Sequence, residues 1–460
     1  MTLIKSISGI RGTIGGEPDN NLTPLDLVKF ASAYGTWIKS KYPNKRITIV
    51  IGRDARISGA MVEAIVVNSL LALGIDVINL GLSTTPTVEL AVPLEHADGG
   101  IILTASHNPK QWNALKLLNN KGEFIDAKAG ELILELAASE NFSYAEVDDL
   151  GVQTQNQSYL QKHIDEVLKL KLVDAAKIRS KGFKVVVDGV NSTGGLFIPA
   201  LLKELGVEVV ELYCEPNGQF PHNPEPLEKH LGAIKQAVVE HQADFGIVVD
   251  PDVDRLAFVS EDGTMFGEEY TLVACADYVL SKTPGNTVSN LSSSRALSDI
   301  ASKHHGSYTA ASVGEVNVVH CMKDTNAIIG GEGNGGIIYP ESHYGRDALV
   351  GTALFLMLLS EKNIKVSELR ATYPAYFMRK DKIELDATID VDGLLEAIEQ
   401  RYQNERINTQ DGVKIDFENH WIHLRKSNTE PIIRVYTEAP SVKEAEAVAN
   451  AIMEEIKSLV

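Results

Sequence analysis

The sequence predicts an α/β protein: three tandem, related α/β domains with mixed sheets and a C-terminal α+β domain, arranged around a central cleft. One observation is length, since 460 residues exceed a single hydrophobic core and correspond to roughly three or four domains. A second is composition, because 44% apolar and 23% charged residues are typical of packed globular chains. The third is a recurring order of strand, glycine-containing loop, helix and strand.

The first domain is predicted over residues 1–152. Apolar runs at 46–51 and 75–80 have the character of strands, and segment 61–73 between them has a helical pattern that ends at a glycine. This order is a βαβ signature. The polar segment 151–158 is the expected linker to the next domain.

The second and third domains are predicted over residues 153–260 and 261–373. Each repeats the plan of the first, the third more weakly. The expected strands are 183–187 and 207–212 in the second domain, and 286–291 and 307–311 in the third. A long helical pattern begins at Asp347, and the chain reaches the third boundary at Tyr373 and Pro374, because proline disfavours helix in the residue before it.

The last domain, residues 374–460, departs from this plan. The expected elements are a helix at 391–402, strands at 413–417, 421–424 and 432–437, and a helix at 441–459. Strands that follow one another without an intervening helix predict an α+β unit.

Composition also narrows the possible partners and compartment. A net charge of -19 argues against nucleic-acid binding, which depends on clustered Lys and Arg. We expect no membrane span and no secretory leader, since no long uncharged apolar stretch is present. Three widely separated cysteines, Cys214, Cys275 and Cys321, suit reduced thiols in the cytoplasm.

The loop at residues 104–109 follows the apolar run 99–103. A buried strand that ends in Thr, Ser, Asn and Pro opens into a tight loop, which places Ser106 where a site can form. The alternative is an ordinary turn in which Ser106 and Asn108 bond local backbone.

The most specific motif contains Asp250, Asp252 and Asp254, followed by Arg255. Three carboxylates at every second residue repel one another unless a hard cation binds them, so the motif predicts a divalent metal site. An EF-hand calcium loop is the competing interpretation, but its turn requires glycine where Arg255 stands, and the flanks have strand character. A solvated acidic turn is the other alternative.

A glycine-rich segment, residues 330–336, contains Glu332 and Asn334. Its glycines let the backbone approach a ligand closely, and the two polar side chains suit the hydroxyls of a sugar. The spacing is not that of a dinucleotide or P-loop fingerprint. A plain flexible loop remains the alternative.

Segment 425–434 lies between two predicted strands and combines two arginines with hydroxyls and an amide. This combination predicts a phosphate cradle, with a charged hairpin tip as the alternative. The residues expected to bind phosphate are Arg425, Ser427, Asn428, Thr429 and Arg434.

Two further cations are ambiguous alone: Arg11, between glycines, and Lys116, shortly after the serine loop. Together, a serine, a metal loop, a sugar loop and a phosphate cradle, each from a different domain, predict phosphoryl transfer on a phosphosugar at a central cleft.

The four motifs resemble, in order and over the whole chain, those of the α-D-phosphohexomutases, a family of isomerases of carbohydrate metabolism that includes phosphoglucomutase, phosphomannomutase and phosphoglucosamine mutase. The resemblance implies a phosphorylated Ser106 that interconverts hexose 1-phosphate and 6-phosphate through a hexose 1,6-bisphosphate, which also activates the enzyme. It implies Mg²⁺ held by Asp250, Asp252, Asp254 and an oxygen on Ser106. Glucosamine phosphate is the first substrate expected, followed by mannose and glucose phosphates, in a monomer or homodimer.

By position, the resemblance implies a catalytic set of Ser106, Arg11, Lys116, His107 and Arg255. Lys116 would need a lowered pKa to act as a base. A metal-dependent sugar phosphatase and a catalytically silent sugar-phosphate binding protein are the alternatives from other classes.

Two departures from the family pattern stand out. Some members have a His at the end of the sugar loop, where this chain has Gly336. We expect His343, or the pair Arg346 and Asp347, to compensate for the missing histidine, and Arg346 and Asp347 to bind substrate. The loop Glu332, Gly333, Asn334 also differs from the Glu-x-Ser form common in the family, which leaves the subgroup open.

Overall fold

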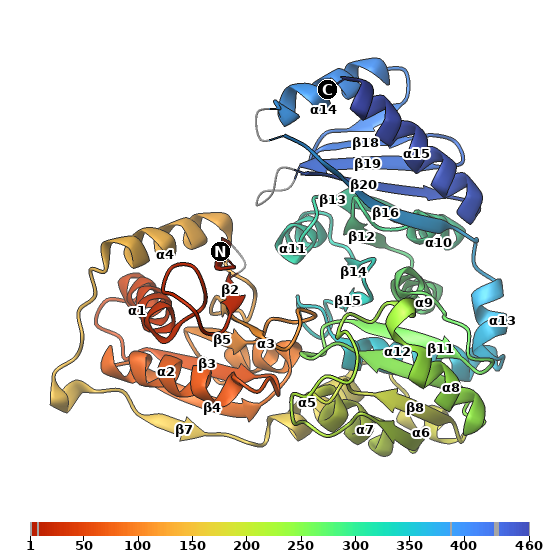
Figure 1. Cartoon of the computed structure of the whole chain (residues 1–460). Coiled ribbons are helices and arrows are strands. Elements are labelled where there is room, and N and C mark those ends of the chain that lie inside the picture. Colours follow the sequence, from red (N-terminus) through yellow and green to blue (C-terminus); the bar gives the residue numbers. More distant parts are fainter. Residues whose placement is uncertain (1, 7–8, 387–388, 427–431, 460) are drawn as a thin grey trace.

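The computed structural model describes residues 2–6, 9–386, 389–426 and 432–459. Within these ranges the chain forms four β-sheets in chain order, covered by helices (Figure 1). The sheets follow one another along an arc, with the first and the fourth at its two ends. The expected fold class, three related α/β units followed by a different C-terminal unit, is confirmed.

The first sheet has seven strands in the order β1-β2-β6-β5-β3-β4-β7. They are β1 (Ile4–Ser6), β2 (Gly9–Thr13), β3 (Thr48–Arg53), β4 (Asp76–Leu82), β5 (Gly99–Leu103), β6 (Trp112–Leu118) and β7 (Gln153–Gln155). Helices cover both faces, since Ile49 and Ile51 of β3 lie in one apolar core and Val50 lies in another. The helices are α1 (Pro24–Lys41), α2 (Gly59–Ala72) and α4 (Ala127–Ser139) on the first core and α3 (Thr85–Leu94) on the second.

The second sheet has the order β11-β10-β8-β9 and the third has the order β13-β12-β14-β15. Their strands are β8 (Lys184–Asp188), β9 (Glu208–Leu212), β10 (Phe245–Val249), β11 (Leu256–Ser260), β12 (Asn286–Asn290), β13 (Ser307–Ala311), β14 (Ile329–Glu332) and β15 (Gly336–Ile338). One hydrophobic core extends over both sheets. It includes Phe355, from the helix Ala348–Lys362 that follows the third sheet, whose ring stacks on Phe258 of β11 with the ring centroids 3.7 Å apart. The loops that follow β10 and β14 are therefore supported by one common core.

The helices of this middle part are α5 (Tyr159–Lys169), α6 (Ala175–Arg179), α7 (Gly194–Glu204), α8 (Gly232–Glu240), α9 (Glu268–Lys282), α10 (Ala296–Lys303), α11 (Glu315–Asp324), α12 (Ala348–Lys362) and α13 (Val366–Ala371). Short 3₁₀ turns lie at Val147–Asp149 and Glu228–His230. Among the described residues, no helix combines the length and apolar character of a membrane span.

The fourth sheet is antiparallel, in the order β16-β20-β19-β18-β17. Its strands are β16 (Phe377–Glu384), β17 (Arg406–Asn408), β18 (Val413–Asp416), β19 (Trp421–Lys426) and β20 (Ile432–Ala439). Helices α14 (Val391–Arg401) and α15 (Val442–Leu459) share one apolar core with it. Residues 427–431, between β19 and β20 in sequence, lie outside the described residues, and so do the expected ligands Ser427, Asn428 and Thr429.

Candidate active site

Ser106 lies in the loop between β5 and β6 and is 7% exposed. Its φ of 48° lies in the left-handed region, which is costly for a residue other than glycine. Its backbone N–H donates to the hydroxyl of Thr104 at 2.9 Å. The sequence-predicted buried strand that opens into a tight loop is thus present, with the serine in a strained conformation.

Arg56 holds this loop in place, and the sequence did not reveal it. Its side chain is fully buried and donates to Asp54 at 2.9 Å. Its two terminal nitrogens donate to four carbonyl oxygens of the loop and its exit, those of Ser106, Asn108, Pro109 and Trp112. A guanidinium suits this task because it presents several donors in one plane. The only sequence signal was an arginine within a turn.

Asp250, Asp252 and Asp254 lie between β10 and β11, fully buried, with one ligand oxygen from each within 4.8 Å of the others. Oδ1 of Asp252 and Oδ1 of Asp254 have no hydrogen-bond partner among the described residues. Burial and the two neighbouring carboxylates raise the pKa of Asp250 well above its usual value. Free, buried carboxylate oxygens fit a hard divalent cation, which would neutralise their repulsion.

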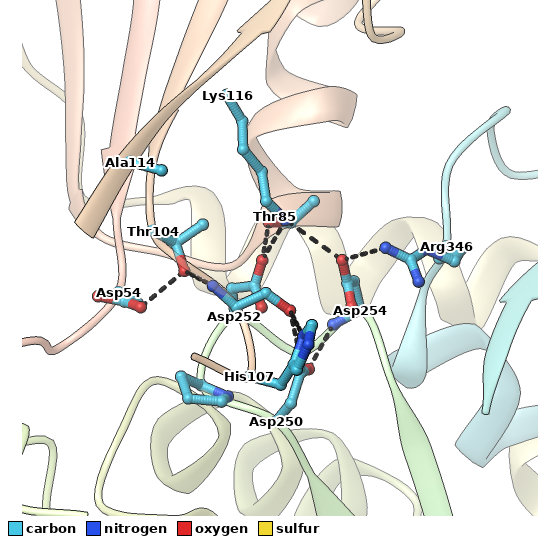
Figure 2. A network of polar contacts seen from close by, with 12 residues as sticks. Asp54, Thr85, Thr104, His107, Ala114, Lys116, Asp250, Asp252, Asp254 and Arg346 are labelled. Carbon is cyan, nitrogen blue, oxygen red and sulfur yellow. Dashed lines mark hydrogen bonds and ion pairs between the residues drawn. The ribbon is translucent and has the colours of Figure 1, made fainter. Parts of the chain in front are cut away.

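The serine loop and the acidic triad meet directly (Figure 2). The Ser106 hydroxyl donates to Oδ2 of Asp250 at 2.7 Å, and the figure labels the neighbours Thr104 and His107 close to the three aspartates. Lys116, on β6, reaches the same triad: its Nζ lies 2.7 Å from Oδ2 of Asp252 and 3.3 Å from Oδ2 of Asp254. The structure therefore brings the serine and the lysine, which are near each other in sequence, to the metal motif, which is far from both.

These contacts bear on the role of Lys116. Burial lowers its pKa, but Asp252 and Asp254 more than offset that effect and raise the pKa above its ordinary value. In these surroundings Lys116 is a cation that donates hydrogen bonds. The two carboxylates therefore oppose the lowered pKa that a general base would need, and the catalytic role of Lys116 stays a prediction.

His107 lies beside the serine, and Arg255 is near His107. His107 Nδ1 is 3.4 Å from Ser106 Oγ, and burial, together with the charge of Arg255, lowers the pKa of His107 to about 3. The imidazole is therefore neutral near pH 7. Arg255 is 9% exposed, and its Nη1 lies 3.4 Å from Glu225.

The sugar loop joins β14 to β15 and packs against the strand that follows the metal loop. A Cβ on Gly335, whose φ is 88°, would lie 2.2 Å from the carbonyl oxygen of Leu256, so this close approach requires glycine. Glu332 is buried and accepts hydrogen bonds from Asn290, Arg346 and the N–H of Gly314. Asn334 accepts from the N–H of Gly336 at 3.2 Å.

Arg346 and Asp347 follow the sugar loop and are buried. Arg346 donates to three carboxylates, which belong to Asp254, Glu315 and Glu332. Asp347 caps α12, its Oδ1 accepting from two backbone N–H groups while its Oδ2 faces His163 and His343. Both side chains are thus engaged with other protein groups among the described residues, and the substrate-binding role expected of them from the sequence stays a prediction.

His343 lies between two buried carboxylates, and the compensating role considered for it stays a hypothesis. Its Nε2 lies 3.1 Å from Asp347, and its Nδ1 lies 3.5 Å from Glu89, a buried carboxylate of α3. Burial raises the pKa of Glu89 well above its usual value, and neither of its oxygens has a hydrogen-bond partner among the described residues. The sequence did not single out Glu89.

The structure describes the residues on either side of the expected phosphate cradle, in β19 and β20. Arg425 of β19 and Arg434 of β20 are direct cross-strand neighbours, and Lys382 of β16 is opposite Arg434 on its other side. Residues directly opposite in a sheet share a face, so three cations lie in a row there. Arg425 is paired with Asp411 at 3.0 Å, and Arg434 is exposed.

Arg11 of β2 faces this cluster from the first sheet. Desolvation, followed by the positive charge of Arg434, lowers the pKa of Arg11, although its side chain remains exposed. Two arginines from opposite ends of the arc therefore lie close enough to repel each other. An anion between them would relieve the repulsion.

Four sheets in an arc hold a strained serine bonded to a buried acidic triad, and the fourth sheet adds a cationic strand pair. Comparison with known proteins identifies the family. Domains I, II and III and the C-terminal domain of the phosphoglucomutase/phosphomannomutase family match residues 3–144, 161–263, 267–376 and 361–455. The chain belongs to this family.

Curated relatives cover nearly the whole chain. A phosphoglucomutase/phosphomannomutase of Thermococcus kodakarensis is 36% identical over 94% of this chain and 95% of its own length. A phosphoglucosamine/phosphogalactosamine mutase of Sulfurisphaera tokodaii is 32% identical over 98% of both chains. A phosphoglucomutase/phosphomannomutase family protein of Burkholderia thailandensis has the same fold, with a TM-score of 0.84 and 23% identity over 99% of this chain and 98% of that one.

Proposed function

We propose that this chain is a phosphohexomutase that interconverts hexose 1-phosphate and hexose 6-phosphate, with Ser106 as the phosphoryl carrier. The observation that carries the proposal is the 2.7 Å hydrogen bond from the Ser106 hydroxyl to Asp250, inside a triad that retains two free buried oxygens. This arrangement places a hydroxyl that can accept a phosphoryl group next to a site for a divalent cation.

Asp250, Asp252, Asp254 and an oxygen on Ser106 would hold Mg²⁺, which would supply charge neutralisation during phosphoryl transfer. In the first transfer, the bond between Ser106 Oγ and phosphorus breaks as the free sugar hydroxyl bonds to phosphorus, and the proton of that hydroxyl passes to Ser106 Oγ, which is left as a hydroxyl. The hexose 1,6-bisphosphate then turns end for end, and the second transfer returns its other phosphoryl group to Ser106.

The chain's own residues support both ends of such a ligand. Lys116, Arg255 and the neutral His107 line the reacting end, where Lys116 is a cation beside the triad. Arg434 and Arg425, with Ser427, Asn428 and Thr429 between them in sequence, are our candidates for the distal phosphate, and Arg11 faces Arg434. Glu332 and Asn334 are our candidates for the sugar hydroxyls.

Glucosamine phosphate is the first substrate we propose, followed by mannose and glucose phosphates. The names of the relatives support both choices, because one is a phosphoglucosamine/phosphogalactosamine mutase and the more similar one is a phosphoglucomutase/phosphomannomutase. We expect a reducing compartment such as the cytoplasm and a monomer or homodimer, the latter to be measured by light scattering.

The deciding experiment combines turnover with intact mass. Wild type, primed with a hexose 1,6-bisphosphate, is expected to convert a hexose 1-phosphate into the 6-phosphate and to gain the mass of one phosphoryl group. Ser106→Ala is expected to lose both. Ser58→Ala is the matched control, since Ser58 lies at the start of α2 and contacts Asn113 rather than the triad.

Two results would contradict the proposal. Stoichiometric release of inorganic phosphate without any 6-phosphate would indicate a phosphatase. The same mass gain in Ser106→Ala would place the phosphoryl group on another residue.

A further inference from the structure

Gly336 and Arg346 are in contact because the chain folds back along β15. Ile338 and Arg346 form an antiparallel bridge, and the N–H of Asp347 donates to the carbonyl oxygen of Ile337 at 2.8 Å. Gly336 lies two residues before Ile338, so it belongs to the same face as Arg346 and is its diagonal neighbour. The side chain of Arg346 therefore lies over Gly336.

The stem of Arg346 occupies the space that a side chain at position 336 would need. A Cβ on Gly336 would lie 2.3 Å from Cδ of Arg346 and 3.0 Å from its Cγ. Gly336 has no left-handed φ, so its backbone alone would accept other residues. The glycine is required by the arginine, which gives a physical reason for the absence of a histidine at this position.

The guanidinium of Arg346 joins three carboxylates from three separate segments. Nη2 donates to Asp254 of the metal loop at 2.8 Å, Nη1 to Glu332 of the sugar loop at 3.0 Å, and Nε to Glu315 at the start of α11 at 2.8 Å. Figure 2 shows the first of these contacts beside the triad. Each nitrogen serves one acceptor, an arrangement that the compact ammonium of a lysine does not reproduce.

The surroundings make this contact necessary. Arg346 is 8% exposed and Glu315 and Glu332 are similarly buried, so water does not neutralise the three carboxylates. Without the guanidinium they would repel one another across the junction of the second and third sheets. Oδ1 of Asp254 accepts no hydrogen bond among the described residues, because Arg346 and Lys116 both bind Oδ2, and Nε of Arg255 lies 3.9 Å from it.

We propose that Arg346 is a positioning residue that couples the metal loop to the sugar loop, and that Gly336 is its obligatory counterpart. This inference rests on the proposed function, since it takes Asp254 as a metal ligand and Glu332 as a sugar ligand. It assigns the arginine no contact with substrate. Its loss displaces Asp254 and Glu332 together, so metal binding and sugar binding weaken together.

The first test compares Arg346→Met and Arg346→Lys with wild type. For both variants we expect Mg²⁺ affinity, measured by calorimetry without substrate, to fall about 10- to 100-fold, as is usual when a group that orients a metal ligand is removed. The KM for the hexose phosphate should rise in parallel. Arg370→Met is the matched control, because Arg370 is a partly buried arginine of α13 that donates to Phe266 and stacks on Tyr270 outside the site.

The second test asks whether the two positions act as a pair. Gly336→Ala in the wild-type background should displace the Arg346 stem and reproduce the loss of Mg²⁺ affinity. In an Arg346→Ala background the stem is absent, so the same change should have little further effect. Circular dichroism of each variant shows whether it is folded, and only folded variants enter the comparison.

Unchanged Mg²⁺ affinity in folded Arg346→Met, or equal effects of Gly336→Ala in both backgrounds, would overturn the inference. These outcomes are distinct from failure of the proposed function, which the wild type alone tests by its turnover. A variant that loses metal affinity while the KM stays unchanged would also contradict the coupling.

Discussion

At the scale of single residues, the acidic triad is the part of the site whose chemistry depends most on a ligand. Asp252 and Asp254 each use Oδ2 to bind Lys116 and leave Oδ1 free. Buried free carboxylate oxygens are costly, so the native state gains stability when a cation fills the site.

We therefore predict that Mg²⁺ raises the melting temperature of the chelator-treated protein. Binding to the native state alone stabilises it by about 2.7 kcal/mol when free metal is 100 times the dissociation constant. Asp254→Asn should lose most of this increase, because it removes one charge from the triad. Differential scanning calorimetry with and without Mg²⁺ measures it.

The control for this prediction is Asp262→Asn, which removes the same charge from an exposed turn after β11. It should keep the full metal-dependent increase. A melting temperature that does not respond to Mg²⁺ in the wild type would show that the triad does not bind the metal.

Glu269, at the start of α9, gives a pH-dependent prediction. Its side chain is 12% exposed, and burial raises its pKa to about 8 although Lys380 opposes the shift. The folded state therefore holds a proton that the unfolded state releases above its own pKa of 4.5. This contribution to stability is complete below about pH 4.5 and is lost as the pH rises to about 8.

Glu269→Gln should remove that loss, because the amide is neutral at every pH and its oxygen can still accept from the N–H of Ser294. Relative to wild type, the variant should gain up to about 4 kcal/mol in free energy of unfolding between pH 5 and pH 9. Urea unfolding at the two pH values measures the difference. Glu268→Gln, at a neighbouring and more exposed carboxylate, should show a smaller change.

The site residues that the sequence predicts act through near neighbours in sequence, whereas the residues that it misses act through contacts that only the fold creates. Asp250, Asp252 and Asp254 could be predicted as a metal site because they stand at every second residue, so their mutual repulsion follows from the sequence alone. Arg56 and Arg346 were not assigned their roles, since each bonds groups that only the fold brings near. For the same reason the pKa of Lys116 could not be predicted without its two carboxylate neighbours.

At the scale of elements, α12 shows how one helix start stabilises the site. Its N-cap, Asp347, satisfies two backbone N–H groups with one oxygen and faces His163 and His343 with the other. The helix begins directly after Arg346, so the cap also fixes where that arginine emerges. The two histidines come from α5 and from the loop before α12, which makes this cap a junction of separate segments.

We predict that Asp347→Ala destabilises the protein by about 3 kcal/mol, about 1 from the cap and the rest from the charged hydrogen bonds. Asp390→Ala is the matched control, because Asp390 caps α14 through one backbone N–H and is exposed. It should cost only about 1 kcal/mol. Equal losses in the two variants, measured by urea unfolding, would mean that the histidine contacts contribute nothing.

The βαβ elements were predicted within a few residues, because their apolar runs are buried on both faces and bounded by glycine. The strand β7 was missed: all three of its residues are exposed, and it lies within the segment expected to be a linker, where it pairs with β4 as an edge strand. Its polar sequence carries no strand pattern. β6, which carries Lys116, was also missed, because it returns antiparallel directly from the serine loop.

At the scale of the whole molecule, the two ends of the arc carry like charges that face each other. Arg11 belongs to the first sheet and Arg434 to the fourth, and the pKa of Arg11 is lowered first by burial and then by the positive charge of Arg434. Arg425 and Lys382 flank Arg434 in the same sheet and add to the positive potential. A doubly charged phosphosugar between the ends would turn this repulsion into attraction to a shared ligand.

Arg11→Met and Arg434→Met should therefore each raise the KM for the hexose phosphate about tenfold, the loss of roughly one charged hydrogen bond. The KM of the wild type should also rise with ionic strength, since salt screens exposed charges, and both variants should show a weaker salt dependence.

Arg401→Met, which removes an exposed arginine paired with Glu455 on the fourth domain, is the control and should leave both the KM and its salt dependence unchanged. If Arg401→Met raises the KM as much as Arg434→Met does, the effect reflects net charge alone. A difference between the two would instead assign the phosphate to the face on which Arg434 meets Arg11.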